Sequence, residues 1–319
     1  MAYTSSGDVS RPEISQFLEE SAKADEFFVA SKILPTQTVN SRAGRFPRIK
    51  RDKGQLLKHG STLRAPSGGY PEIARATEWD TYQCDERGAE ERIDDVAVEE
   101  MSSFYSAERI TSKLLMRYLM LDYEKRVADT VFDSSTFNTT AMGTALTEAN
   151  LATVDFAKDL LEAIERMQRK AEVPNTLVMS QTVWNRIRRT TALQTFLFGN
   201  NIGNGYRLVG PSDIGSAFGV PNVVIAGATH DSANKGQSPV LTPVWSNDYV
   251  GLLNVQGGDF SSGGVGRTLV WGADSPGGLF TSESRRDDAR RSDVMRVRTN
   301  SVEKILDDGS AELIETNFA

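Results

Sequence analysis

Apolar residues recur at helical spacing along a stretch of the chain that holds no helix breaker. Glycine is absent between Gly88 and Gly143, and proline is absent between Pro71 and Pro174. From 94 to 132 the apolar positions that recur every three or four residues are Phe104, Ala107, Ile110, Leu114, Leu115, Tyr118, Leu121, Val127 and Val131. This pattern predicts a helix over 94–132 with one wide apolar face. The alternatives are a break near 102–103 or two ordinary core helices.

A shorter amphipathic stretch precedes this helix. Residues 13–34, EISQFLEESAKADEFFVASKIL, group Ile14, Phe17 and Leu18 near one end and Phe27 and Phe28 near the other. The stretch ends before Pro35, which cannot continue a helix. It predicts either a surface helix of a single domain or a segment that packs on a neighbouring molecule.

The middle of the chain predicts a helix, a buried strand and a second helix. Thr153 can cap the first helix and Pro174 stops it. Its apolar stripe is Phe156, Leu160, Leu161, Ile164 and Met167. The run NTLVMS at 175–180 predicts a buried strand, and residues 181–193 predict the helix that follows it.

The last third alternates short strands with turns. Seventeen of the 26 glycines lie between Gly199 and Gly278, which indicates many tight turns. Short strands are predicted within 205–210, 220–228, 242–255 and 266–273. The pair Asp308-Gly309 predicts a hairpin turn between strands at 302–306 and 311–315.

A charged excursion separates the two N-terminal helical stretches. Strand-like pieces at 45–51 and 77–85 flank the turn-rich segment APSGGYP at 65–71. Between Arg42 and Arg64 there are eight Lys or Arg residues and one acid, whereas 72–100 holds eleven acids and three Arg. A two-stranded hairpin with so few apolar residues is marginal in water, so it needs a surface to lie on. We expect that surface to be another copy of the chain, basic limb against acidic limb.

Composition restricts the class of protein. The chain has 319 residues, a hydrophobic fraction of 39% and a formal net charge of -7, which suits a globular protein with a large core. Cys84 is its one cysteine, which excludes a disulfide framework. No signal peptide and no apolar run of membrane-spanning length is visible, so we expect a soluble protein made in a cytoplasm, with no membrane partner.

The sequence offers few candidate catalytic or binding residues. The chain has two histidines, His59 and His230, too few with one cysteine for a His/Cys zinc site. The run GGDFSSGGVGRTLV fails as a phosphate loop, because the lysine position is Arg267 and a strand-like sequence follows. Cys84 is followed by two acids, which disfavour its thiolate. We therefore expect no catalytic residue, no cofactor and no metal site.

Nucleic acid is a weaker explanation of the basic block. Phe46 and Tyr70 are too few for a base-stacking platform, and the adjacent acids would repel phosphate. Nonspecific contact with packaged DNA is a separate, smaller expectation.

The order of these parts resembles a known family. Residues 45–88 match an extended charged loop, 94–133 a long spine helix, and 173–189 the strand and helix that open an axial domain. Residues 242–255 and 293–315 resemble late strands, and the phrases YQCDERGAEERIDD and RRDDARRSDVMRVR have the same character. Together they resemble the major capsid proteins of tailed double-stranded DNA phages, which have the Hong Kong 97-type fold.

The resemblance implies an α+β fold with five parts. These are an N-terminal arm (1–44), an extended E-loop (45–92), a P-domain with the spine helix (93–172), an axial A-domain (173–250) and strands that return to the P-domain (251–319). It implies a structural protein, with no enzyme activity, that assembles into pentamers and hexamers of an icosahedral head around double-stranded DNA.

The expected contacts between subunits lie on the charged excursion. The basic members are Arg45, Arg48, Lys50, Arg51, Lys53, Lys58 and Arg64, and the acidic members are Glu78, Asp80, Asp85 and Glu86. The expected partners are further copies of the chain, with scaffolding, portal and decoration proteins. The expected location is the virion, after assembly in the host cytoplasm.

Two other classes stay open at this point. One is an encapsulin-like shell with the same fold that encloses an enzyme cargo. The other is an enzyme or nucleic-acid-binding protein that does not assemble.

Overall fold

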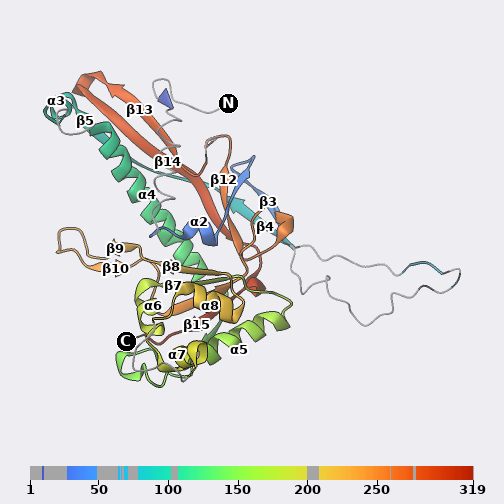
Figure 1. Ribbon diagram of the computed structural model, residues 1–319. Coiled ribbons are helices and arrows are strands. Elements are labelled where there is room, and N and C mark those ends of the chain that lie inside the picture. Colours follow the sequence, from blue (N-terminus) through green and yellow to red (C-terminus); the bar gives the residue numbers. More distant parts are fainter. Residues whose placement is uncertain are drawn as a thin grey trace.

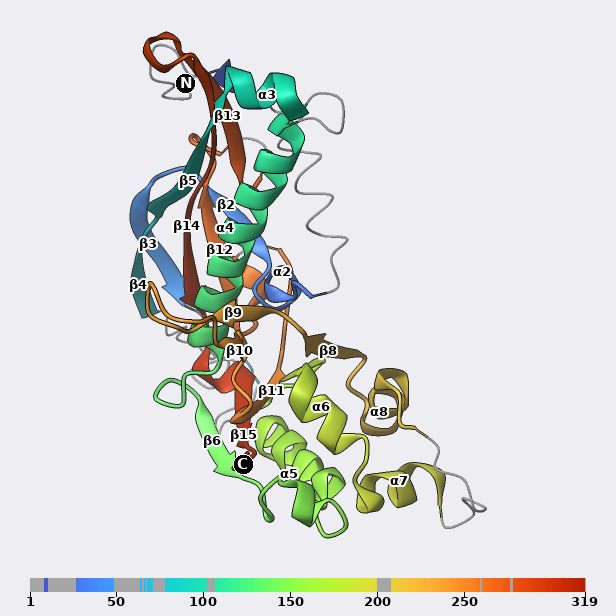
Figure 2. The ribbon, with the colours of Figure 1, turned by 90° about the vertical axis from the view of Figure 1, so that its left-hand side faces the viewer.

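The chain folds into two bodies joined near the middle of the molecule (Figure 1). The computed structural model describes residues 9–10, 27–48, 64, 66, 68–70, 78–101, 107–199, 208–258, 260–275 and 278–318. The first body is a long sheet with the helix α4 (Ala107–Val131) lying along it. The second is a smaller sheet with helices packed on it (Figure 2).

The sheet of the first body has six strands. They are β1 (Val9–Ser10), β2 (Thr36–Val39), β5 (Asp85–Asp94), β12 (Gly266–Trp271), β13 (Thr281–Asp287) and β14 (Ser292–Ile305). Their order is β1-β13-β14-β12-β2, and β5 pairs with β14 on its other edge. The β5–β14 register is antiparallel from Asp85↔Ser301 to Asp94↔Ser292, while β2 runs parallel to β12. The 14-residue β14 is therefore the axis of this body.

The sheet of the second body has five strands in the order β6-β15-β11-β7-β8. They are β6 (Asn138–Ala141), β7 (Thr176–Ser180), β8 (Asn222–Ala226), β11 (Tyr249–Leu253) and β15 (Ala311–Glu315). In β7, Val178 faces the core shared with α4, and Leu177 and Met179 face the core under the helices. Both faces of β7 are covered, which explains why NTLVMS lacks polar alternation.

Helices cover the far face of this second sheet. They are α5 (Phe156–Arg169), α6 (Gln181–Ile187), α7 (Thr191–Phe198) and α8 (Pro211–Phe218). The predicted stripe of α5 is confirmed for Phe156, Leu160, Ile164 and Met167, which are buried, but Leu161 is exposed. Its N-cap is Asp155, whose side chain accepts from Lys158 N–H, and not Thr153 as predicted.

The long helix differs from its prediction at its start. The structure has α3 (Asp95–Met101) and then α4, with 102–106 outside the described residues. Figure 2 shows α3 at an angle to the start of α4, so the structure agrees with the predicted alternative of a break and not with one continuous helix over 94–132. Asp95 accepts two 2.6 Å hydrogen bonds from Arg286 of β13, which hold α3 at the tip of the sheet.

The buried face of α4 is also rotated from the predicted one. Leu115, Val127 and Val131 are buried as predicted, but Ile110, Leu114 and Tyr118 are 38%, 57% and 68% exposed. The buried row contains Leu115, Met116, Leu119, Met120 and Tyr123 together with Thr111, Ser112 and Glu124. Hydropathy alone does not predict that this row is buried, because three of its members are polar.

One predicted helix and two predicted strand regions take a different form. The helix predicted over 181–193 is two helices, since α6 ends at Ile187 and α7 begins at Thr191. The described part of the strand predicted at 205–210 is irregular and leads into α8. The strand region at 242–255 holds β10 (Leu241–Pro243), which pairs with β9 (Thr229–Asp231), and then β11.

The predicted Asp308-Gly309 hairpin is wrong. The flanking strands β14 and β15 lie in different sheets. Asp307 accepts from Gly309 N–H at 2.9 Å and closes a short 3-10 turn, while Leu306 N–H donates to Val265 O. The turn residues therefore make a corner between the two bodies.

The structure groups several segments differently from the predicted divisions. Residues 27–39 belong to the first body, through Phe28, Ile33, Leu34 and β2. Residues 85–92 lie in its sheet. α5 and β15 belong to the second body.

A buried carboxylate holds the junction of the two bodies. Glu124 of α4 is fully buried and accepts hydrogen bonds from Val29 N–H (3.1 Å) and Ala30 N–H (2.9 Å) at the start of α2 (Ala30–Ile33). It also accepts from the indole N–H of Trp245 at 2.6 Å. Burial raises the pKa of Glu124, and the three donors oppose that rise. One side chain thus joins α2, α4 and the segment that leads into β11.

Replacing this carboxylate should destabilise the fold. In Glu124→Ala the N–H groups of Val29, Ala30 and Trp245 lose their shared acceptor inside the core. We expect the free energy of unfolding to fall by about 2–4 kcal/mol, measured by urea denaturation followed by tryptophan fluorescence. Glu124→Gln should cost less, because one amide oxygen still accepts. The exposed Glu165→Gln on α5 is the control, and equal midpoints for it and Glu124→Ala would contradict the assignment.

Candidate functional site

The base of the charged excursion is a two-stranded sheet, as predicted. Strand β3 (Ala43–Arg48) pairs antiparallel with β4 (Glu78–Gln83), from Ala43↔Gln83 to Arg48↔Glu78. This sheet has a small core of its own, where Phe46, Tyr82 and Cys84 pack with Leu269 and Leu306 of the first body. The excursion therefore begins from an anchored base, with more apolar packing than its sequence indicates.

Two residues expected to face neighbours contact each other. Arg48 Nε donates to Leu306 O at 3.0 Å, and its guanidinium lies 3.8 Å from the Asp80 carboxylate. This pairing follows from the register, which brings the ends of β3 and β4 together. Arg48 therefore anchors the hairpin to its own chain.

The other basic residues divide into two groups. Lys50, Arg51, Lys53 and Lys58 lie outside the described residues. Arg45 and Arg64 are exposed. Arg64 donates to Gly68 O at 2.6 Å and lies over the ring of Tyr70, 5.1 Å from its centroid.

Several acids between 72 and 100 are paired with arginines of the same chain. Glu90 on β5 lies 3.0 Å from Arg296 and 3.9 Å from Arg285. The Arg286 guanidinium holds the pKa of the Asp95 carboxyl below its ordinary value. The physical reason is the pairing of β5 with β14, which brings these acids beside arginines distant in sequence.

The first acids of β5 remain at the surface. Asp85 and Glu86 are exposed at the start of the strand, opposite Ser301 and Asn300, and Arg87 lies 3.6 Å from Asp85. Glu78, on β4, is half-buried. The structure thus places Asp85 and Glu86 along β5, away from the β3–β4 end where Arg48 and Asp80 meet.

The cysteine is unsuited to nucleophilic chemistry. Cys84 is fully buried, and burial together with the Asp85 charge raises the pKa of its thiol to about 11. The thiol is therefore protonated at neutral pH.

The glycine-rich run has a packing role. Arg267 is fully buried, and its guanidinium donates to the carbonyls of Gly263 and Gly266 at 2.9 and 2.8 Å. A Cβ at Gly266 would lie 2.5 Å from Lys304 O, so close strand packing requires glycine there. Residues 266–271 form strand β12, which confirms that no phosphate-loop helix follows.

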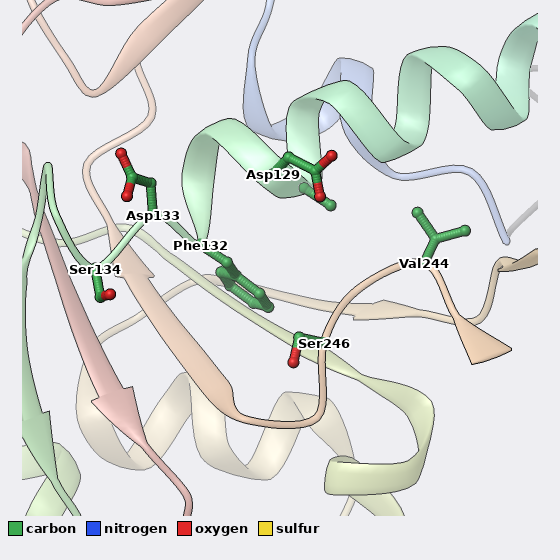
Figure 3. Close-up of a pocket in the computed structure, with 7 residues that line it drawn as sticks. Asp129, Phe132, Asp133, Ser134, Val244 and Ser246 are labelled. Carbon is green, nitrogen blue, oxygen red and sulfur yellow. The ribbon is translucent and has the colours of Figure 1, made fainter. Parts of the chain in front are cut away.

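A pocket of about 270 Å³ lies where α4 ends, beside the segment that carries Val244 and Ser246 (Figure 3). Ala128, Asp129, Phe132, Asp133 and Ser134 complete its lining. Its two carboxylates have local partners. Asp129 accepts from Lys125 at 3.2 Å, and hydrogen bonds from Ser135 and Thr136 lower the pKa of Asp133. Both carboxylates therefore take part in the local structure at the end of α4.

In the described part of the chain, no three His, Cys, Asp or Glu side chains gather in a way that could hold a metal ion. No described helix is both long enough and apolar enough to cross a membrane.

Several structurally important charges escaped sequence reasoning. Arg298, Glu283 and Asp274 form a buried ion-paired group in the first body, with Arg298 to Glu283 at 2.8 Å and Arg298 hydrogen-bonded to Asp274. Glu312 is fully buried in the second body and pairs with Arg166 at 2.6 Å. No local pattern marks these residues, because their partners are distant in sequence.

Comparison with known proteins identifies the family. The family model described as phage capsid protein matches residues 80–307, which include strands and helices of both bodies. No curated protein matches the chain.

Solved structures share the fold at low sequence identity. A phage-related protein of Bordetella bronchiseptica RB50 is 15% identical, with 97% of this chain and 98% of that chain covered and a TM-score of 0.71. The capsid of cyanophage P-SCSP1u is 17% identical, with coverage of 90% and 87% and a TM-score of 0.57. The SrpI encapsulin complex of Synechococcus elongatus PCC 7942 is 12% identical, with coverage of 92% and 88% and a TM-score of 0.51.

The order of the elements, the long helix beside its sheet and the family match over 80–307 lead to one conclusion. The chain belongs to the phage capsid protein family and has the α+β Hong Kong 97-type fold.

Proposed function

We propose that the chain is the major subunit of a phage head, which self-assembles through pentamers and hexamers into an icosahedral shell around double-stranded DNA. The family match over both bodies is the observation that carries this proposal. The subunit works through its shape and its contacts and carries out no reaction. Cys84 and Arg267 support that view, since each is fully buried and has a packing role.

The elongated first body suits a shell subunit. Its length along β14 and α4 offers extended edges on which several neighbours can contact one molecule (Figures 1 and 2). Contacts of this kind are heterologous and close by rotation into rings. Many weak contacts per subunit allow misplaced copies to dissociate before the shell closes.

We assign the charged contacts between subunits to part of the predicted set. Arg45, Arg64, Asp85 and Glu86 are exposed, and two of them, Arg64 and Asp85, also have partners within the chain. Lys50, Arg51, Lys53 and Lys58 belong to the proposal on their sequence position alone. Arg48 and Asp80 contribute less across the interface, because they pair within the chain.

Further partners follow from the same proposal. A scaffolding protein, a portal and decoration proteins would bind the shell, and packaged DNA would touch it without sequence preference. Assembly would take place in the host cytoplasm, and the mature location would be the virion.

An encapsulin-like shell is the second candidate. The fold similarity to the Synechococcus elongatus encapsulin complex favours it. The match to a phage capsid family favours the phage head. The contents of the particles distinguish the two candidates, because a phage head encloses nucleic acid and an encapsulin-like shell encloses a protein cargo.

Purified chain should form closed particles. We expect negative-stain microscopy to show shells of uniform diameter, alone or after addition of the phage's scaffolding protein. A monomer at all concentrations under both conditions would contradict the proposal. In particles isolated from infected cells, nuclease-protected DNA supports the phage head, and a packaged enzyme supports the encapsulin-like alternative.

Reversing basic charges on the excursion should block assembly and spare the fold. For Arg45→Glu with Lys50→Glu we expect the yield of shells to fall about tenfold or more, because like charges would then face each other at every repeated contact. Circular dichroism should match the parent protein. The control is Lys158→Glu with Arg169→Glu, an equal charge change on α5. Loss of assembly in both pairs, or in neither, would contradict the assignment.

Assembly should depend on salt more strongly than folding does. Raising the salt concentration from 0.1 M to 1 M shortens the Debye length from about 10 Å to about 3 Å, which screens exposed pairs. We expect light scattering to show slower early assembly, while the urea midpoint of the subunit changes little. An assembly rate independent of salt would indicate mainly apolar contacts.

A further inference from the structure

Strand β5 forms one border of the six-stranded sheet. β14 has β13 and β12 along one edge and β5 along the other, and in the described part of the chain no strand pairs with the outer edge of β5. All ten residues of β5 are described. An outer edge of this length presents backbone N–H and C=O groups that can pair with a strand of another molecule.

The charges of β5 reverse in sign about the middle of the strand, at Ala89. Arg87 lies two residues before Ala89, and Glu91 lies two residues after it. Glu86 lies three residues before Ala89, and Arg92 lies three residues after it. Within the described residues, Glu86, Glu91 and Arg92 are exposed and form no ion pair with another side chain. The strand therefore carries exposed charges that its own subunit does not neutralise.

Two copies of β5 that pair antiparallel about Ala89 would match in charge. Glu86 of each copy would face Arg92 of the other copy, and Arg87 would face Glu91. Opposite charges at directly facing positions stabilise an antiparallel pair, and like charges there destabilise it. The contact would thus hold four favourable charge pairs, because the two-fold symmetry repeats each of them.

A pairing centred on one residue also keeps both sheets the same way up. Ala89 and Ile93 face the core shared with α4, and the residues between them face the other side of the sheet. In this pairing each residue lies opposite a residue of the same face. The α4 helices of both copies would therefore lie on one side of the joined sheet, with a two-fold axis perpendicular to it.

The neighbouring registers of this kind bring like charges together. In a pairing centred on Gly88, Glu86 would face Glu90. In a pairing centred on Glu90, the two Glu90 side chains would face each other, and Glu86 would face Asp94. The charge pattern of the strand therefore favours Ala89 as the centre over either neighbouring choice.

We propose that β5 pairs with β5 of a second copy, antiparallel and centred on Ala89, as a two-fold contact between subunits. The contact rests on the proposed function, because it specifies one interface of the shell. Rings formed through heterologous contacts must still be joined to one another, and an icosahedral shell has two-fold axes between them. A self-complementary strand edge is suited to such an axis, since the same surface serves both subunits.

A pair of cysteines tests the register. In the full chain carrying Glu86→Cys and Arg92→Cys, we expect mild oxidation to join two copies, seen by non-reducing electrophoresis and located by peptide mass mapping. The two positions lie about 20 Å apart along one strand, so a disulfide between them within one chain is excluded. They are chosen because Arg87 already lies 3.6 Å from Asp85 of its own chain. Native Cys84 can stay, because it is buried.

The single variants Glu86→Cys and Arg92→Cys are the matched controls. In the proposed register each cysteine would lie about 20 Å from its counterpart in the other copy, so both variants should stay reduced. Free thiols in the double variant, or equal crosslinking in a single variant, would overturn the proposal. The measurement is made on unassembled protein and on particles, so a chain that forms no shell still shows whether this contact exists.

A charge swap tests the pairing by a second route. We expect Glu86→Arg to weaken self-association of the unassembled chain about tenfold in analytical ultracentrifugation, because positive side chains would then face each other. Adding Arg92→Glu should restore association. Glu162→Arg, an equal change of charge on α5 in the second body, should leave it as in the parent chain. A parent chain that does not associate, no effect of Glu86→Arg, or no rescue would each overturn the pairing.

Discussion

A buried carboxylate joins the three segments that meet between the two bodies. Glu124 accepts hydrogen bonds from the start of α2 and from Trp245, so it holds the segment before β2 and the segment before β11 beside α4. Trp245 in turn packs edge-on against Phe132 at the end of α4, with centroids 5.0 Å apart. The core around them also includes Leu313 of the second sheet. The relative placement of the bodies depends on this junction, because a buried acceptor with three donors tolerates little displacement.

Several charged residues of the first body are paired inside the subunit. The pairs Glu90–Arg296 and Arg298–Glu283 lie in a row across β5, β14 and β13, and similar pairs hold the tip and the second body. The acidic segment that follows the hairpin is therefore part of a structural sheet.

Local sequence patterns predict the elements that depend on residues close together in the chain. The strands β3 and β4, the stripe of α5 and the strand β7 all follow from short-range alternation or helical spacing. The buried face of α4 differs from the predicted one because Thr111, Ser112 and Glu124 are buried although they are polar. The Asp308-Gly309 turn was recognised as a turn, yet its strands separate into two sheets. A turn signal specifies the local backbone and does not specify which strands pair.

The sequence by itself determined the class of protein, the two-stranded hairpin, the long helical region and the absence of a recognisable reaction motif. Those features depend on composition and on spacings of a few residues. Only the tertiary structure decided that Arg48 pairs with Asp80, that β5 lies against β14, and that Glu124 joins α2 to Trp245. Each of these contacts joins acidic side chains, arginines or backbone groups that lie far apart in the sequence. Many such partners exist in a chain with 36 basic and 43 acidic residues, and packing of the two cores selects among them.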